Sequence, residues 1–437
     1  ARERLARGEA ISYPAPDPAR ATAPAGGDIR SVLERTLGVP IFQEQVMQLA
    51  IVAAGFSPGE ADQLRRSMGA WRRQGELERY QQQLIDGMLA RGYSPEFADQ
   101  ICRQIQGFGS YGFPESHAAS FALLVYFSAW LKRFEPAAFL CALLNSQPMG
   151  FYSPSQLIQD ARRHGVEVLG ADVTVSGWDC ALEGRSREAP AGGHLEGYRR
   201  ARLPAARLGL RMVKGLSIEA AERIVLARGR RPFGTVDDLA ARARLDAREL
   251  RLLAAAGALV SLAGHRRQAL WQAAGERPRH GVLAEAPVDE APLALPAASE
   301  GEELVADYAA LGFTLGRHPL TLLREHLASL RFVPAGELND YPDRKLARGA
   351  GIVTCRQRPS TAKGTMFVTL EDETGLVNVV VHHALVDRQR RELLGARLLG
   401  VFGQIRREGR VVHLVASRVV DHSALLGQLV THARNFH

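Results

Sequence analysis

Apolar residues recur at helical spacing over the first third of the chain, between short polar segments. The run Ser57-Pro58-Gly59-Glu60 supplies an N-cap residue, a proline at the first helical position and a glutamate three residues after the cap. It therefore predicts a helix that ends at about Met68. Before it, residues 1–30 are rich in Pro, Ala, Gly and Arg and predict a loop. Further helices are predicted over residues 76–90, 95–106, 117–134 and 136–145.

The middle of the chain changes to short apolar runs and then returns to helices. After a helix predicted near 154–164, the runs Val166–Leu169 and Trp178–Leu182 predict short strands, and a Gly- and Arg-rich loop follows to about residue 200. Residues 206–275 again show helical spacing, punctuated by glycine. Residues 276–300 have the composition of a linker, and helix is predicted over 302–330.

Residues 350–420 alternate between apolar and polar with a period of two, which predicts strands. An amphipathic stretch near 383–394 lies between the third and fourth of them. Five strands with a helix after the third are typical of an OB-fold, although another small barrel or a sandwich would show the same alternation. The five predicted strands are Gly351–Cys355, Thr365–Leu370, Leu376–Val381, Ala396–Phe402 and Arg410–Val415.

Composition favours an anionic partner and argues against a membrane protein. The formal charge of +8 and a pI near 9.6 favour nucleic acid, although only four of the 55 basic residues are lysine, so a single arginine carries little weight. The apolar stretch at residues 118–131, which is followed by Lys132 and Arg133, is too short to span a bilayer. The four cysteines lie far apart, without zinc-ligand spacing, as in a cytoplasmic protein with reduced thiols.

Residues 210–225 have the pattern of a helix-hairpin-helix, in which the backbone amides of a tight turn cradle a DNA phosphate. The turn Lys214, Gly215, Leu216 and Ser217 is the predicted DNA contact, and Lys214 adds a mobile charge. Ser217 stands where a second glycine is usual and can cap the following helix. A degenerate second copy is predicted within 239–271. A plain helical hairpin remains the alternative for both.

Two segments of the first third are candidates for binding phosphate. A Gly- and aromatic-rich loop over 107–117 leads into a long apolar helix and places Ser116 and His117 at the helix N-terminus, unless the loop serves only to turn the chain and pack a core. Adjacent Arg65 and Arg66 could clamp a triphosphate, or could form a solvated helix face in which Asp62 pairs with Arg66.

The sequence lacks a catalytic constellation of its own. Two-metal phosphoryl transfer requires clustered carboxylates, and no D-x-D pair occurs in the chain. The run Glu371-Asp372-Glu373 falls at a predicted hairpin turn and is interpreted as turn chemistry. HExxH, P-loop and GxSxG motifs are also absent from the sequence.

Four long motifs stand out in the first third of the chain: VPIFQEQVMQLA (39–50), ADQLRRSMG (61–69), GSYGFPESHAASFA (109–122) and AWLKRFEP (129–136). Together they resemble the fingers of bacterial C-family DNA polymerases, the family of the DNA polymerase III alpha subunit. The resemblance continues through LGFTLGRHP (311–319) into the predicted OB-fold. The Pro-Glu-Ser-His run at 114–117, FVTLEDETG (367–375) and the final ARNFH are similar to the error-prone branch, and Glu115 stands where replicative fingers usually carry a basic residue.

This resemblance implies a C-terminal part of an error-prone, damage-induced translesion polymerase. The full-length enzyme would extend primer–template DNA with deoxynucleoside triphosphates, using Mg²⁺ held by palm aspartates that would lie before residue 1, so the present chain alone is expected to be inactive. Arg65, Arg66, Tyr111, Ser116 and His117 are the expected nucleotide contacts. Lys363 and Phe367 are expected to contact the template, although Phe367 alternates in phase with expected core residues. Mutagenesis-complex subunits are expected partners, and no membrane is.

The expected architecture is multidomain, mainly α with β. Its segments are partial helical fingers (1–150), a small α/β connecting region (151–205), a tandem helix-hairpin-helix region (206–275), a linker and helical segment (276–345), an OB-fold (346–425) and a tail (426–437). The alternative to a polymerase is a non-catalytic DNA-binding adaptor built from helix-hairpin-helix and OB modules. A further reading treats these modules as protein-docking surfaces and the charge as arginine bias.

Overall fold

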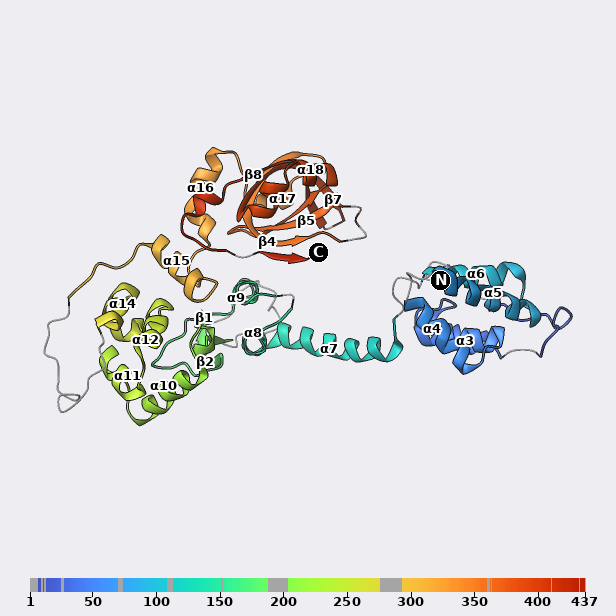
Figure 1. Cartoon of the computed structure of the whole chain (residues 1–437), viewed down its shortest axis with the longest axis horizontal. Helices are drawn as coiled ribbons and strands as arrows, with labels where there is room; N and C mark the ends of the chain where they lie inside the picture. The colour runs from blue at the N-terminus through green and yellow to red at the C-terminus, as the bar shows by residue number, and fades with distance from the viewer. Residues whose placement is uncertain are drawn as a thin grey trace. The chain divides into compact units, whose positions relative to one another are not determined.

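A computed structural model gives the structure of two compact units, Ala1–Trp130 and Leu131–His437, each described here by itself. The helices of both and the barrel of the second are drawn in Figure 1. The residues described are 7–8, 11, 13–24, 27–69, 74–107, 113–150, 152–187, 203–275, 293–359, 362, 364–409, 411–431 and 433–436.

The first unit is helical, as predicted. Its core is formed by apolar residues that recur on facing sides of the helices, including Leu49, Leu64 and Met88. The predicted capping box is present, because the Ser57 amide donates to Glu60 and the Glu60 amide donates to the Ser57 hydroxyl. Its helices are α2 (Ile29–Leu33), η1 (Glu34–Thr36), α3 (Gln43–Ala54), α4 (Pro58–Gly69), α5 (Gln74–Ala90) and α6 (Pro95–Gly107), followed by α7 (Glu115–Phe134), which ends in the second unit.

The second unit begins with a small α/β region whose core continues into the helices that follow. Helices α8 (Pro136–Asn145) and α9 (Pro154–Arg163) precede a three-stranded sheet of order β1-β3-β2. The short strands β1 (Val168–Leu169) and β2 (Ala181–Arg187) confirm the predicted ones, whereas β3 (Leu203–Arg207) was not predicted. One hydrophobic cluster joins Leu144 of α8 to Leu253 and Phe313, so the small sheet and the following helices fold around a common core.

The following segment consists of short helices, most of them with strong N-caps. Ser217, Thr235 and Asp246 each accept a hydrogen bond from a backbone amide three residues later, so the polar caps set where α10, α11 and α12 begin. The elements are η3 (Leu210–Met212), α10 (Ile218–Arg230), α11 (Val236–Ala243), α12 (Ala247–Ala255), α13 (Val260–Ala263), α14 (Arg266–Gly275), α15 (Glu300–Ala310), α16 (Pro319–Ser329) and α17 (Ala335–Asp340).

The predicted OB-fold is confirmed by a closed five-stranded barrel. Its strands are hydrogen-bonded in the order β4-β5-β6-β8-β7, and β7 pairs back with β4. A further short strand, β9, was not predicted; it lies alongside β4 in parallel register (Figure 1). The barrel elements are β4 (Leu346–Gln357), β5 (Met366–Glu371), β6 (Leu376–Val381), α18 (His383–Arg388), α19 (Arg390–Gly395), β7 (Leu398–Glu408), β8 (Val411–Asp421) and β9 (Arg434–Phe436), with η5 (Ser423–Leu426) between the last two strands.

The amphipathic stretch after the third barrel strand is broken into two helices, whereas a single one was predicted. Gln389 lies between α18 and α19 with φ −119° and ψ 39°, outside the helical range. Its side-chain amide donates to the Val419 carbonyl and accepts from the Val419 amide, each at 2.9 Å. This paired contact with β8 provides a physical reason for the break. No local sequence pattern predicts it.

An ion pair between neighbouring strands of the small sheet makes stability depend on pH. Arg207 Nη2 donates to Glu183 Oε1 at 2.7 Å, and this hydrogen bond is the main cause that lowers the pKa of Glu183 below its ordinary 4.5. Since the folded state then binds fewer protons than the unfolded state, stability rises with pH in this window and is lost as the pH falls through the folded pKa.

We therefore expect the urea midpoint of the second unit to fall as the pH drops below 4.5. The contribution of this pair is at most about 1 kcal/mol, because Glu183 is partly exposed. The matched variant Glu183→Gln should show a shallower dependence in the same titration. Equal slopes for the two proteins would contradict the assignment.

Candidate nucleic-acid interface

The turn before α10 presents backbone amides at the start of that helix. Gly215 adopts φ +80°, a left-handed conformation that favours glycine. Ser217 caps the helix by accepting from the Ala220 amide at 3.2 Å. Among the residues described, the amide groups of Gly215 and Ser217 have no hydrogen-bond acceptor. The turn therefore has the geometry of a phosphate-binding hairpin, as its sequence predicts.

Lys214 is fixed to a neighbouring helix and is not the mobile charge that the sequence suggested. Its ammonium donates to the carbonyls of Tyr308 and Ala309 at 3.1 and 3.3 Å, and its backbone amide donates to the Ala310 carbonyl at 3.0 Å. Burial lowers the pKa of Lys214. These carbonyls end α15, where a cation complements the helix dipole. A phosphate contact through this side chain stays a prediction.

Arg248 places a second cation beside the same turn. It is exposed on α12, and its Nη2 donates to the Gly215 carbonyl at 3.4 Å. Leu252, one helical turn further on, packs close to the glycine as well. Arg248 is 33 residues from Gly215 in the chain, so only the packing of α12 against the turn reveals the contact.

The predicted second hairpin is more closed than the first. After α12 the chain turns at Gly257, with φ +76°, and the Ala258 amide donates to the Leu253 carbonyl at 2.9 Å. A β-carbon on Gly257 would lie 3.1 Å from Nη2 of Arg266, so this guanidinium occupies the space beside the turn. The first turn is therefore the better candidate for a DNA phosphate.

Both arginines expected to contact the triphosphate pair with one aspartate. Arg65 donates to Asp62 Oδ1 through Nε at 2.9 Å and Nη2 at 2.8 Å, and Arg66 Nε lies 2.8 Å from Oδ2. The hydrogen bond from Arg65 and the charge of Arg66 lower the pKa of Asp62. This arrangement is the helix-face alternative, extended to both arginines. A triphosphate at this place would compete with the Asp62 carboxylate.

The start of α7 is also occupied by carboxylates. The Glu115 amide donates to Glu44 Oε2 at 2.9 Å, and the Glu115 side chain pairs with Arg35 at 2.7 Å. Ser116 and His117 are exposed in the first turn, and the His117 ring stacks 4.3 Å from Phe121. The Glu44 carboxylate thus takes one position at the helix N-terminus where phosphate was expected. The expected contact Tyr111 lies outside the described residues.

The phase expected for Phe367 on the barrel was wrong. Met366 and Val368 are buried, whereas Phe367 is 37% exposed on β5, because successive side chains of a strand point to opposite sides. Phe367 pairs in register with Gln357 of β4 and Val380 of β6. An exposed ring on this face remains available for stacking on a base, whereas Lys363 lies outside the described residues.

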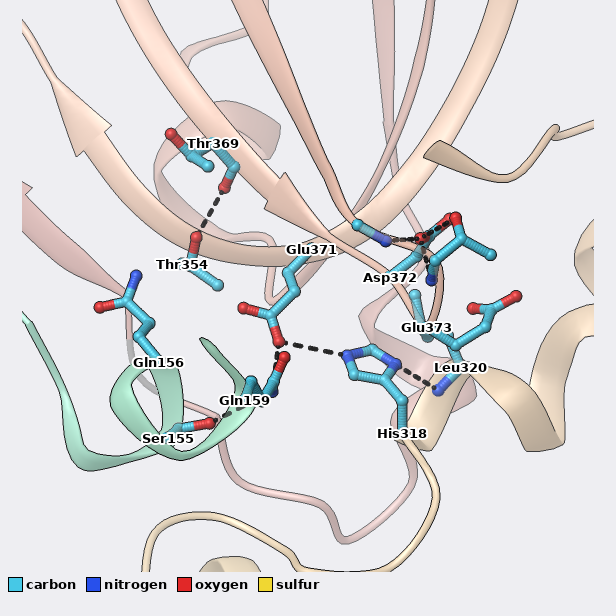
Figure 2. Close-up of polar contacts among 12 residues, drawn as sticks. Ser155, Gln156, Gln159, His318, Leu320, Thr354, Thr369, Glu371, Asp372 and Glu373 are labelled. Atoms are coloured by element: carbon cyan, nitrogen blue, oxygen red, sulfur yellow. Dashed lines mark hydrogen bonds and ion pairs between the residues drawn. The ribbon is translucent and has the colours of Figure 1, made fainter. Parts of the chain in front are cut away.

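The carboxylates at 371–373 accept hydrogen bonds within the fold, in keeping with the turn chemistry interpreted from their sequence position. Asp372 Oδ1 accepts from the amides of Thr374 and Gly375 at 2.8 and 3.0 Å, and Oδ2 accepts from the Ala335 amide at 2.8 Å. Glu371 accepts from Gln159 of α9 at 2.7 Å (Figure 2). It also lies 3.5 Å from the His318 ring.

The Mg²⁺ expected for the polymerase reaction does not fit this chain's described residues. Divalent cations in two-metal sites need carboxylate oxygens with free lone pairs. Glu373 and Asp372 instead share the guanidinium of Arg324. The described part of the chain contains no group of three or more side chains that could hold a metal ion. Nor does that part contain a helix long and apolar enough to cross a membrane.

Comparison with known proteins places these modules in a family. Residues 3–106 match the bacterial DNA polymerase III alpha subunit finger domain, and residues 165–269 match the helix-hairpin-helix motif. The chain is 67% identical over its whole length to the error-prone DNA polymerase of Aromatoleum aromaticum. Along its whole length the chain is thus similar to error-prone DNA polymerases, and its first part to the finger domain of the C-family.

Two further error-prone DNA polymerases, from Azoarcus sp. and Dechloromonas aromatica, are 63% and 60% identical over 96% and 94% of the chain. The chain covers 38–40% of the length of these three C-family relatives. Among solved structures, an asparaginyl-tRNA synthetase from Pyrococcus horikoshii aligns with a TM-score of 0.19 at 21% identity over 23% of each chain, a likeness too slight to bear on fold or function.

Proposed function

We propose that this chain supplies the finger and DNA-binding modules of an error-prone, DNA-templated DNA polymerase. The observation that carries the proposal is the 67% identity, along the whole chain, to a protein named as such. The substrates would be primer–template DNA and deoxynucleoside triphosphates. The Mg²⁺ ions would be held by carboxylates in the part of the relatives that this chain does not match. We further propose that this polymerase synthesises DNA across damaged template in the cytoplasm, alone or with mutagenesis-complex subunits.

The contribution of the described residues to this function is a sequence-independent hold on DNA. The free amides of Gly215 and Ser217 would bind a backbone phosphate, and the adjacent Arg248 guanidinium would add a charge-assisted contact. Contacts of this kind position the duplex without reading its bases, as a polymerase requires. The exposed Phe367 ring would stack on a template base at the barrel.

Binding of this chain to a labelled primer–template at several salt concentrations tests the DNA-binding role. We expect the logarithm of the affinity to fall linearly with the logarithm of the salt concentration. Arg248→Glu should weaken binding roughly tenfold and reduce the salt slope by about 1. Arg230→Glu makes the same charge change at the far end of α10, about 18 Å away by helical rise, and should have little effect. Salt-insensitive binding, or equal losses in both variants, would contradict the proposed interface.

A non-catalytic adaptor remains the second candidate, because the carboxylates at 371–373 are all engaged within the fold. A chimera separates the two: the matching segment of the Aromatoleum aromaticum polymerase is replaced by this chain and primer extension is measured. A polymerase segment should retain extension at a rate similar to the parent. A folded chimera that binds primer–template without extending it would favour the adaptor.

A further inference from the structure

A basic pocket lies on the barrel. Its volume is about 310 Å³, near the lower end of the range of small-molecule sites. The pocket is bounded by the end of β4, by α18 and α19, and by β9. Three arginines and several apolar side chains line it, and none of its lining residues is acidic. The lining includes Arg356, Arg358, Arg390, Met366, Leu394 and Phe436.

Arg356 gives the pocket a buried positive charge. The residue is 6% exposed. Its Nε donates to the Leu393 carbonyl at 2.7 Å and its Nη1 donates to Asn435 Oδ1 at 3.5 Å, while the remaining nitrogen donates to the Ala396 carbonyl. All three acceptors are neutral, and no carboxylate pairs with Arg356 among the described residues. Burial lowers the pKa of this guanidinium. The carbonyls of Leu393 and Ala396 at the end of α19 offset part of this charge, and an anion bound nearby would stabilise it further.

Two further guanidiniums stand at the pocket without an ion-pair partner in the described part of the chain. Arg358 follows β4, and its backbone amide donates to the Phe436 carbonyl at 3.1 Å, which fixes it beside β9. Arg390 is exposed at the start of α19. Arginine forks of this kind match the oxygens of a phosphate in pairs. Together with Arg356 they set three positive charges around one small cavity.

The apolar part of the lining adds a surface for the rest of a ligand. Phe436 is 39% exposed and Leu394 is 45% exposed, so both side chains are partly open to solvent. Met366 also lines the pocket and belongs to the side of β5 opposite to Phe367. Phe367 itself does not line the pocket, although its register partner Gln357 does.

We propose that this pocket binds one nucleotide unit, with its phosphate among Arg356, Arg358 and Arg390 and its sugar or base against Phe436 and Leu394. The unit is either a free nucleotide or one nucleotide of a single strand of DNA. The cations alone specify a phosphate; naming the strand as a source rests on the proposed function. The site would give the barrel a second hold on nucleic acid or a place for a small phosphate ligand.

Titration of the whole chain with thymidine 5′-monophosphate, followed by calorimetry, and with fluorescein-labelled (dT)₁₀, followed by anisotropy, tests the site. The variants are Arg358→Ala and Arg390→Ala, which leave the buried Arg356 and the fold in place. Arg391→Ala is the matched control, since Arg391 is exposed beside Arg390 on α19 but does not line the pocket. Each pocket variant should weaken binding at least about tenfold, and the control less than about twofold.

The outcomes separate the two sources. If Arg358→Ala and Arg390→Ala weaken binding of thymidine 5′-monophosphate and Arg391→Ala does not, the result supports a free nucleotide as the ligand. If the pocket variants weaken binding of (dT)₁₀ only, the result supports one nucleotide of a single strand. Binding of both probes that is unaffected by the pocket variants, binding of neither, or equal weakening by Arg391→Ala, overturns the site when circular dichroism shows the variants folded. Arg248→Glu, measured with primer–template, reports separately on the hairpin, so failure of the pocket and failure of the proposed function are distinguishable.

Discussion

Replacing Asp372 by alanine is expected to lower the free energy of unfolding of the barrel by about 3–5 kcal/mol. The carboxylate is 2% exposed, and both of its oxygens accept hydrogen bonds. Its removal leaves the Ala335 and Thr374 amides without this hydrogen-bond acceptor. Arg324, itself largely buried, then keeps only its ion pair with Glu373 among the described residues. The large effect follows from these unsatisfied partners and not from the strength of any single bond.

Hydrogen exchange of barrel peptides in graded urea measures this change, since residues 346–437 contain no tryptophan to report on it by fluorescence. Asp387→Ala removes an exposed aspartate of α18 and should change stability by less than about 0.5 kcal/mol. If Asp372→Ala shifts the exchange transition no more than this control, the turn is not the anchor that its contacts indicate.

Arg266→Met is expected to destabilise the helix-hairpin-helix segment by about 3–5 kcal/mol. Arg266 is 9% exposed and its Nη1 donates to the Glu303 carbonyl at 2.9 Å, while its Nη2 is hydrogen-bonded to the buried carboxylate of Asp307. Methionine retains the apolar stem but removes the guanidinium that pairs with Asp307 and Glu303. Among the described residues only the Thr314 hydroxyl, at 2.6 Å, then still donates to the Asp307 carboxylate. Urea unfolding followed by tryptophan fluorescence, to which Trp271 of α14 contributes, measures the loss.

The neighbouring Arg267 provides the control for this prediction. It pairs with Glu302 at 2.9 Å, but both side chains are exposed, so Arg267→Met should cost less than about 1 kcal/mol. The two variants make the same chemical change one residue apart on α14 and differ mainly in burial. Similar midpoints for both would show that burial of the Arg266 pair contributes little to stability.

The barrel was the most predictable part of the fold because its signal is local. Alternation with a period of two located all five strands, and the bounds predicted for Leu376–Val381 agree with β6. The break at Gln389 and the pairing of β9 with β4 could not be predicted, because each depends on a partner from a distant part of the chain. The wrong phase for Phe367 has a simple cause: an exposed aromatic residue in a strand resembles a core residue in the sequence.

In the candidate site, too, local features could be predicted from the sequence and contacts between distant residues could not. Gly215 and Ser217 were found from the sequence, since a left-handed glycine and a helix cap are properties of the turn itself. The contact of Lys214 with Tyr308 could not be predicted, because the two residues are 94 positions apart in the chain. The pairing of both Arg65 and Arg66 with Asp62 could not be predicted either, because it depends on the rotamers of three side chains. The basic pocket likewise joins residues about 80 positions apart, so charge counting along the chain does not reveal it.

The attachment of Lys214 and Arg266 to α15 has a mechanical consequence. Both side chains donate hydrogen bonds to backbone carbonyls of that helix, Lys214 at its last turn and Arg266 earlier. The two hairpin turns are therefore held against the same helix. A force applied by DNA at the first turn would be transmitted to α15 and from there to the segment that leads to the barrel. Because Phe313 is buried in the same core as the hairpin helices, any bending between hairpins and barrel must occur after this residue.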